Sequence, residues 1–239
     1  MKVRRDIYSI KKEARDILRN KWGNPIKVNV LITFLTVIMQ FIISPIDVAT
    51  LEIREIPLKN TIIYYVLNFL LLMPLSQGVI SFTLKFKRRS ESNVGDVFDG
   101  YKVFFPLLIT TAVNMGMAAI ASYLPMWLHV SEAYYNIVFS AALVIVFIAE
   151  CYLSQCGFIF CDGVRNPFKA MVQSVRLMRG NILKYIGLML SFVMWIIGSM
   201  FTMGILMLWF VPYQKVALAV FYDELIGRRE EINEEEPKY

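Results

Sequence analysis

The stretch YIGLMLSFVMWIIGSMFTMGILMLWFVPYQKVALAVFY, residues 185–222, contains one charged residue, Lys215, in 38 positions. As one straight helix it would be about 57 Å long, nearly twice the roughly 30 Å thickness of a bilayer's hydrocarbon core. We therefore expect a helical hairpin that turns near residues 198–204, with arms at 183–200 and 204–222. One span followed by a helix in the membrane interface is the alternative.

Long apolar runs also occur along the rest of the chain. Three further runs carry no charge and a fourth is interrupted only by Glu150; they cover residues 28–46, 60–84, 103–131 and 133–161. A membrane-spanning helix needs about 20 apolar residues. The composition agrees, since 57% of the residues are hydrophobic and 18% are charged, against about 45–50% and 25% in soluble domains. The sequence predicts an all-α, polytopic transmembrane helix bundle of six spans (alternatively five), at about 28–46, 61–84, 103–125, 134–161, 183–200 and 204–222.

Lysine and arginine residues gather on one side of these spans. The segments 1–27, 85–102 and 162–184 and the chain from Lys215 onward hold nine, five, five and four of them, whereas loop 47–61 holds two and the other two loops none. Because cytoplasmic loops retain positive charge, we expect a multi-pass protein of the bacterial cytoplasmic membrane with both termini in the cytoplasm. The chain then divides into a basic amphipathic helix, a membrane domain and an acidic, mobile cytoplasmic tail, at residues 1–27, 28–225 and 226–239.

Two nearly identical pentapeptides, GNPIK at 23–27 and GNILK at 180–184, indicate an internal repeat. Each follows a basic helix with one apolar stripe and precedes a long apolar run. A weaker copy at 94–101 precedes the third uncharged run. The chain is therefore interpreted as three pseudo-repeats, each an interfacial amphipathic helix followed by a transmembrane hairpin. Gly23 and Gly180 are expected to end their amphipathic helices in the left-handed conformation.

The two basic helices have the composition of helices that lie on anionic membranes. The apolar stripe of the second helix, which should begin with Asn166 as cap and Pro167 as first residue, contains Phe168, Met171, Val172, Val175 and Met178. The residues expected at the lipid interface are Lys11, Lys12, Arg15, Arg19, Trp22, Lys27, Arg176, Arg179 and Lys184. The expected partner is the lipid bilayer, with anionic lipids at the cytoplasmic face. A protein partner in the membrane fits the same pattern, and nucleic acid does not.

Two ionisable residues are predicted at membrane depth. Glu150 and Lys215 lie 12 and eight residues before the aspartates that mark the cytoplasmic ends of their spans, so their depths differ by about 6 Å at the helical rise. We expect them to face each other. An isolated charge at this depth costs at least about 2.5–3.5 kcal/mol, which makes these residues candidates for a transport path as well as for helix packing. Further polar side chains within the spans are Asn114, Gln155 and Gln214.

Sequence motifs for catalysis are not found. The three cysteines form no C-x-x-C pair, and the one histidine, His129, has only Glu132 near it as a ligand type. The chain has no G-x-S-x-G, no P-loop and no dinucleotide fingerprint. We therefore expect no enzyme activity, no catalytic residue, no metal site and no cofactor.

Three stretches resemble a known family. They are IKKEARDILRNKWG at 10–23, GNILKYIGLMLSFVMWIIG at 180–198 and LWFVPYQKVALAVFYDEL at 208–225. They are similar to bacterial integral membrane proteins classed as a domain of unknown function, and the signature residues are Gly180, Asn181, Pro212, Tyr213, Phe221 and Tyr222. The resemblance implies a membrane protein with no assigned activity. A distant likeness to the membrane region before some glycerophosphodiester phosphodiesterase domains implies only membrane anchoring or proximity to lipid.

Two functions are consistent with these features. The first is a non-enzymatic membrane scaffold, accessory or envelope-homeostasis component that acts through lipids or protein partners. The alternative is a small transporter or permease that uses Glu150 and Lys215. A polar cavity that reaches Glu150 would favour transport, whereas a packed bundle with a basic face would favour a scaffold.

Overall fold

The computed structural model describes residues 6–43, 58–89, 92–128 and 131–227. Helices and turns make up these residues, and no strand occurs in them. The helices are α1 (Ile7–Leu18), α2 (Gly23–Ile43), α3 (Leu58–Leu67), η1 (Asn68–Leu72), α4 (Met73–Arg89), η2 (Val94–Val103), α5 (Phe104–Trp127), α6 (Glu132–Leu153), α7 (Cys156–Cys161), α8 (Pro167–Met178), α9 (Ile182–Leu190), α10 (Val193–Phe201) and α11 (Met207–Leu225).

Four helical stretches are long and apolar enough to cross a membrane. They are Leu58–Arg89, Val94–Trp127, Tyr134–Cys161 and Ile182–Phe201. A fifth is reached when Ile7–Leu18 and Gly23–Gln40, which meet at 97°, are counted as one broken span. The all-α class and the membrane-helix character are therefore confirmed. The end of the predicted span 28–46 and nearly all of the tail 226–239 lie outside the described residues.

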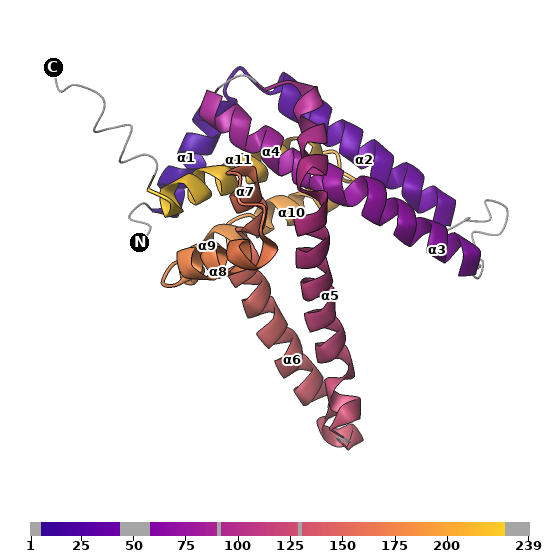
Figure 1. Cartoon of the computed structure of the whole chain (residues 1–239). Coiled ribbons are helices and arrows are strands. Elements are labelled where there is room, and N and C mark those ends of the chain that lie inside the picture. Colours follow the sequence, from indigo (N-terminus) through magenta and orange to yellow (C-terminus); the bar gives the residue numbers. More distant parts are fainter. Residues whose placement is uncertain (1–5, 44–57, 90–91, 129–130, 228–239) are drawn as a thin grey trace. The chain divides into compact units, whose positions relative to one another are not determined.

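The chain forms two compact units. The Lys215 unit consists of Tyr8–Phe104 and Phe192–Val220, and the Glu150 unit consists of Met1–Ile7, Phe105–Ser191 and Phe221–Tyr239. In the Lys215 unit, α2 packs beside α3 and α4 (Figure 1). In the Glu150 unit, α8 packs against α6 and α7, and α9 packs against α6.

In the Lys215 unit, helices α3 and α4 are joined through the wide π-helical turn η1. Pro74, at the start of α4, has no N–H, so the carbonyl four residues before it has no ordinary helical partner. The turn before it opens to the π pattern, in which the N–H of Met73 donates to the carbonyl of Asn68. Such single π-helical turns insert into a helix without ending it, and a stretch of 32 residues, Leu58–Arg89, stays helical.

Helix η2 packs closely against α4 through two glycines. Gly78 of α4 faces the backbone of Val97, and Gly100 of η2 faces the backbone of Pro74; a Cβ added at either glycine would collide with that backbone. Lys85 of α4 forms ion pairs with Asp96, at 2.6 Å, and with Asp99. Helix η2, which contains the segment 94–101 predicted as a weak amphipathic copy, is thus held to α4 by backbone contact as well as by charge.

The apolar stretch 185–222 contains a helical hairpin, as predicted. Helix α10 ends at Phe201, Gly204 adopts a positive φ of 85°, and α11 begins at Met207. Ring contacts pair Phe192 with Tyr213 and Trp195 with Phe210, at centroid distances of 5.7 Å and 6.0 Å, so α10 and the start of α11 run antiparallel. The predicted first arm, 183–200, is divided at residues 191–192 into α9 and α10. Helix α11 is not among the candidate spans.

The predicted span 134–161 corresponds to the candidate span Tyr134–Cys161 of the Glu150 unit, which contains a turn between two helices. Helix α6 ends at Leu153 and α7 begins at Cys156. Ser174 of α8 bonds to two backbone groups that this turn leaves without a helical partner. Its hydroxyl donates to the carbonyl of Tyr152 (2.6 Å) and accepts from the N–H of Gln155 (3.2 Å). Helix interruptions at membrane depth require such replacement partners.

The predicted helix ends are correct for α8 and wrong for α1. The side chain of Asn166 caps α8 by accepting from the N–H of Lys169, Pro167 is the first residue, and Gly180 follows the helix with a φ of 80°. After α1, by contrast, Asn20 takes the left-handed conformation, with a φ of 63°, and Gly23 starts α2. Asparagine adopts this conformation more readily than other residues with a side chain, so the turn did not need the glycine.

Candidate functional site: a cavity around Lys215

Three helices of the Lys215 unit enclose a cavity of about 160 Å³. Its walls come from α2, α4 and α11, three elements that are far apart in the sequence. They contribute Pro25, Val28, Asn29, Ile32, Ser76, Val79, Phe82, Thr83, Val211, Pro212, Lys215 and Val216. Lys215 is the one ionisable side chain among these residues. It forms no hydrogen bond or ion pair with the described part of the chain.

The cavity lies beside a proline in α11. Pro212 cannot donate to the carbonyl of Leu208, so this oxygen lacks its helical partner. Asn29 of α2 supplies one, since its Nδ2 donates to the carbonyls of Met207 (3.2 Å) and Leu208 (3.4 Å). An amide that bonds across two helices both satisfies the freed oxygen and joins the helices. Asn29 therefore positions α11, and Lys215 with it, against α2.

Replacing Asn29 by Leu should cost about 1–3 kcal/mol of stability, because the part-buried carbonyl of Leu208, which Pro212 cannot serve, loses its donor. The penalty should shrink in a Pro212→Ala background, where the restored N–H can bond Leu208 within the helix. Unfolding of the four proteins of this double-mutant cycle in detergent gives the coupling energy. Equal penalties in the two backgrounds would contradict the assignment.

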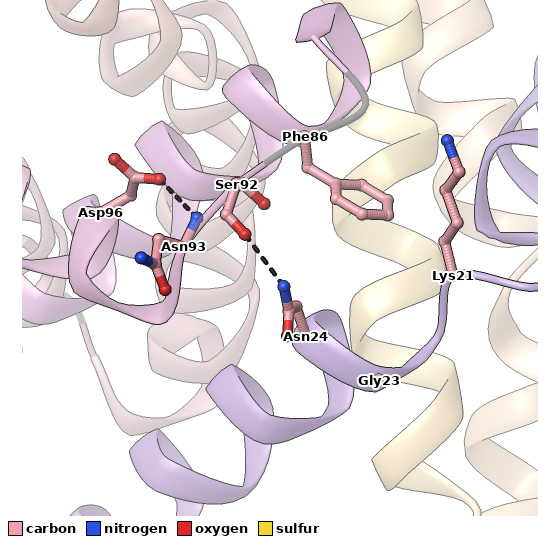
Figure 2. A pocket seen from close by; sticks show the side chains of 7 residues that line it. All are labelled: Lys21, Gly23, Asn24, Phe86, Ser92, Asn93 and Asp96. Atoms are coloured by element: carbon pink, nitrogen blue, oxygen red, sulfur yellow. Dashed lines mark hydrogen bonds between the residues drawn. The ribbon is translucent and has the colours of Figure 1, made fainter.

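A second, polar cleft of about 660 Å³ lies at the start of α2. Lys21, Gly23, Asn24, Phe86, Ser92, Asn93 and Asp96 line it, and Figure 2 shows how the start of α2 and the residues before η2 face each other across it. The side-chain amide of Asn24 donates to the carbonyl of Ser92 at 3.0 Å, and the N–H of Asn93 donates to Asp96 at 2.8 Å (Figure 2). The first bond joins α2 to the segment before η2, and the second caps the start of η2.

The charged groups beside this cleft neutralise one another. They lie between the uncharged runs 60–84 and 103–131, outside the predicted spans. Lys102, at 2.5 Å, and Lys85 bond to Asp99, and these bonds lower the pKa of the Asp99 carboxyl from its ordinary value. Both Asp96 and Asp99 pair with lysine side chains, so this cluster adds no unpaired carboxylate to the cleft.

The predicted polar residues at membrane depth occupy different surroundings. Glu150 is exposed on α6 and does not line the Lys215 cavity. Gln155 is buried at the break between α6 and α7, where its Nε2 donates to Ser154 and its Oε1 has no partner in the described residues. Asn114 also has a buried oxygen without a described partner, and Gln214 is partly buried in α11. Because Glu150 and Lys215 belong to different units, the expected pairing stays a prediction.

The apolar stripe of α1 is covered by protein. Ile10, Ala14 and Leu18 are fully buried. On the same helix the Nζ of Lys11 lies 5.1 Å from the centroid of the Phe192 ring, and its carbonyl accepts from the hydroxyl of Tyr213 at 3.4 Å. The predicted interface residues on this segment divide into an exposed set, Lys12, Arg15, Arg19 and Lys27, and a partly buried set, Lys11 and Trp22.

Helix α8 buries only part of the predicted apolar stripe against the protein. Its buried face is formed by Ala170, Ser174 and Met178, whereas Phe168 and Val172 are 64% and 59% exposed. Small side chains allow α8 to approach α6 and α7 closely. The apolar residues that remain outside lie on the same helix as the exposed Arg176, and the exposed Arg179 and the partly buried Lys184 follow.

The residues that carry the family resemblance are mostly packing residues. Asn181 is buried, and its amide donates to the carbonyl of Leu177 at 3.0 Å. Tyr222 is buried beside the Phe158 ring, and its hydroxyl donates to Asp162 at 2.7 Å. Phe221 is also buried, with its ring against Tyr185. In the Lys215 unit, Pro212 lines the cavity and Tyr213 packs against α10.

A family profile with the description "Protein of unknown function (DUF975)" matches residues 1–229. The chain belongs to the DUF975 family. The match covers almost the whole chain and confirms the resemblance to a family of unknown function. Because the DUF975 description assigns no activity, it transfers no role to any residue of the cavity. None of the curated proteins and none of the solved structures matches the chain.

Sequence reasoning identified Lys215 and Pro212 but missed Asn29 and the cavity that these residues line. Asn29 is a lone amide near the start of an uncharged run, and Pro212 is a proline within another. Both residues are visible in the sequence. A proline in an apolar helix frees a backbone carbonyl, and an amide in another apolar helix can donate a hydrogen bond to such a group. What the sequence did not show is that these two residues meet.

Proposed function

We propose that this chain is a non-enzymatic, six-span protein of the cytoplasmic membrane that acts as a scaffold, accessory or envelope-homeostasis component through anionic lipids and protein partners. The observation that supports this best is the 97° angle between the basic helix α1 and the apolar helix α2. If α2 crosses the membrane, α1 lies along its surface. Lys12, Arg15 and Arg19 are exposed there to meet anionic headgroups.

The six-span arrangement adds α2 and α11 to the four long candidates. It requires both α2 and α11 to cross the bilayer, with Lys215 of α11 facing the cavity. In this arrangement α1, η2 and α8 each precede a spanning helix, which accords with three pseudo-repeats. Both termini are then cytoplasmic, in agreement with the lysine and arginine counts.

Lipid binding by α1 can be tested on the full-length chain in vesicles. Replacing Lys12, Arg15 and Arg19 by Gln should reduce the preference for spin-labelled phosphatidylglycerol over phosphatidylcholine by about fivefold per residue, since a cation near an anionic surface contributes about 1 kcal/mol. Lys59→Gln, an exposed lysine at the start of α3, is the control and should leave the preference unchanged. An unaltered preference in the triple variant would refute the lipid contact. Crosslinking and affinity capture from native membranes would identify a stoichiometric protein partner.

Transport is the second candidate, and the cavity around Lys215 is the observation that favours it. A path of this kind would need polar groups that continue from the cavity, and Glu150 is not one of its lining residues. If Glu150 and Lys215 nevertheless act together, Glu150→Gln should abolish uptake in a cell-based assay while the protein remains folded. Unchanged uptake would remove Glu150 from the mechanism.

A further inference from the structure

The walls of the Lys215 cavity supply one positive charge and no negative charge. Of the lining residues, Asn29, Ser76 and Thr83 are polar and neutral, and the others besides Lys215 are apolar. Lys215 has no ion pair with any described residue. An ammonium group surrounded largely by apolar groups is unfavourable unless an opposite charge or water accompanies it.

The cavity has room for such a companion. One water molecule occupies about 30 Å³ in the liquid, so a volume of about 160 Å³ corresponds to roughly five waters. A small organic ion fits the same space. Val28, Val79 and Val216 supply apolar walls next to the charge, so the cavity suits a ligand that is anionic at one end and apolar at the other.

The neutral polar groups limit the charge of the ligand. Each wall hydroxyl already donates to its own helix, Ser76 to the carbonyl of Met73 and Thr83 to that of Val79, both at 2.7 Å. The amide nitrogen of Asn29 is engaged with α11. These groups therefore offer few free donors, and the ammonium of Lys215 is left as the main donor. One ammonium can compensate one negative charge, whereas a divalent anion would keep a second charge in an apolar site.

We propose that the cavity binds a small monocarboxylate, with its carboxylate on Lys215 and its short apolar chain against the valines. Lys215 lies eight residues before Asp223 along α11, or about 12 Å at the helical rise. In the six-span arrangement this is too deep for the phosphodiester of a phospholipid in the bilayer. Binding requires neither the lipid contacts of α1 nor transport, so it stands or falls separately from both.

Thermal unfolding of the full-length chain in a neutral detergent tests the assignment. Sodium butyrate and acetate are compared with sodium chloride and inorganic phosphate at equal ionic strength, and short-chain phosphatidylglycerol forms a lipid arm. Butyrate should raise the midpoint of the unmodified protein by about 3–6 °C at about ten times its dissociation constant, and the rise should saturate. Lys215→Met should lose this rise.

Two further variants keep the result interpretable. Lys27→Met removes an exposed lysine of α2 outside the cavity and should retain the full response. Val79→Phe leaves Lys215 in place but fills the cavity, and it should lose the response even if Lys215→Met does not fold. A butyrate rise that is the same in all four proteins overturns the proposal. A rise that depends on Lys215 but is caused by phosphate or by phosphatidylglycerol, and not by butyrate, overturns the ligand class.

Discussion

Gly100→Ala is expected to destabilise the protein by about 3 kcal/mol or more, because the added methyl group would overlap the backbone of Pro74. A backbone cannot move aside as a flexible side chain can, so α4 and η2 would have to separate. Their separation would also break the ion pairs of Lys85 with Asp96 and Asp99. Unfolding of the purified protein in detergent measures the loss, and a fluorescent-protein fusion reports the folded amount in cells.

Gly95→Ala is the matched control. Gly95 lies in the same helix, η2, and a Cβ there would meet no atom within 4 Å. Alanine should be neutral or slightly stabilising at this position, since glycine costs roughly 0.5–1 kcal/mol in a helix. If Gly100→Ala and Gly95→Ala proved equally stable, the close packing of η2 on α4 would be wrong.

Phe192→Ala should cost about 3–5 kcal/mol, the range for truncating a buried aromatic ring. Phe192 is 0% exposed. Its ring contacts the rings of Phe210 and Tyr213, both at 5.7 Å between centroids, and Lys11 lies over it. Truncation would leave a void where α1, α10 and α11 meet, and the hairpin of residues 192–213 would lose its anchor. The loss can be measured by unfolding in detergent.

Phe201→Ala removes the same side chain from the end of α10, where it is 86% exposed. It should change the free energy of unfolding by less than about 0.5 kcal/mol. Similar losses in the two variants would mean that Phe192 is not the packing centre of the hairpin. The pair also separates the hairpin from the Lys215 cavity, since neither phenylalanine is among the cavity's lining residues.

Several features were predicted from the sequence because their causes are local. The hairpin in 185–222 follows from the length of this stretch, which has one charged residue in 38, and from the helix-breaking glycine at 204. The cap at Asn166 and the left-handed Gly180 depend on residues within one turn of the helix ends. Gly23 was assigned wrongly for the same reason, because a nearby asparagine could make the turn just as well.

The buried face of α8 could not be predicted in this way. The sequence assigned the apolar stripe of α8, with Phe168 and Val172, to the membrane interface and did not indicate that Ala170 and Ser174 are buried against the protein. In water the more apolar face of a helix packs inward, because burial removes apolar surface from the solvent. Beside a bilayer, lipid tails are as apolar as a protein interior, and helices associate instead through small residues and hydrogen bonds. Ser174 is buried because its hydroxyl bonds to the backbone at the turn between α6 and α7.

The sequence by itself determined the helical class and the positions of the long apolar segments, since these depend on composition and on the spacing of charges along the chain. Its motifs also indicated the family. Only the tertiary structure showed that Asn29 donates to the carbonyl of Leu208, which Pro212 leaves without a helical partner. It also showed that Gly78 and Gly100 allow α4 and η2 to pack backbone to backbone, and that Lys215 lines a cavity. Each of these is a meeting of residues from separate helices. Hydrophobicity cannot specify such meetings where lipid and protein interior are equally apolar.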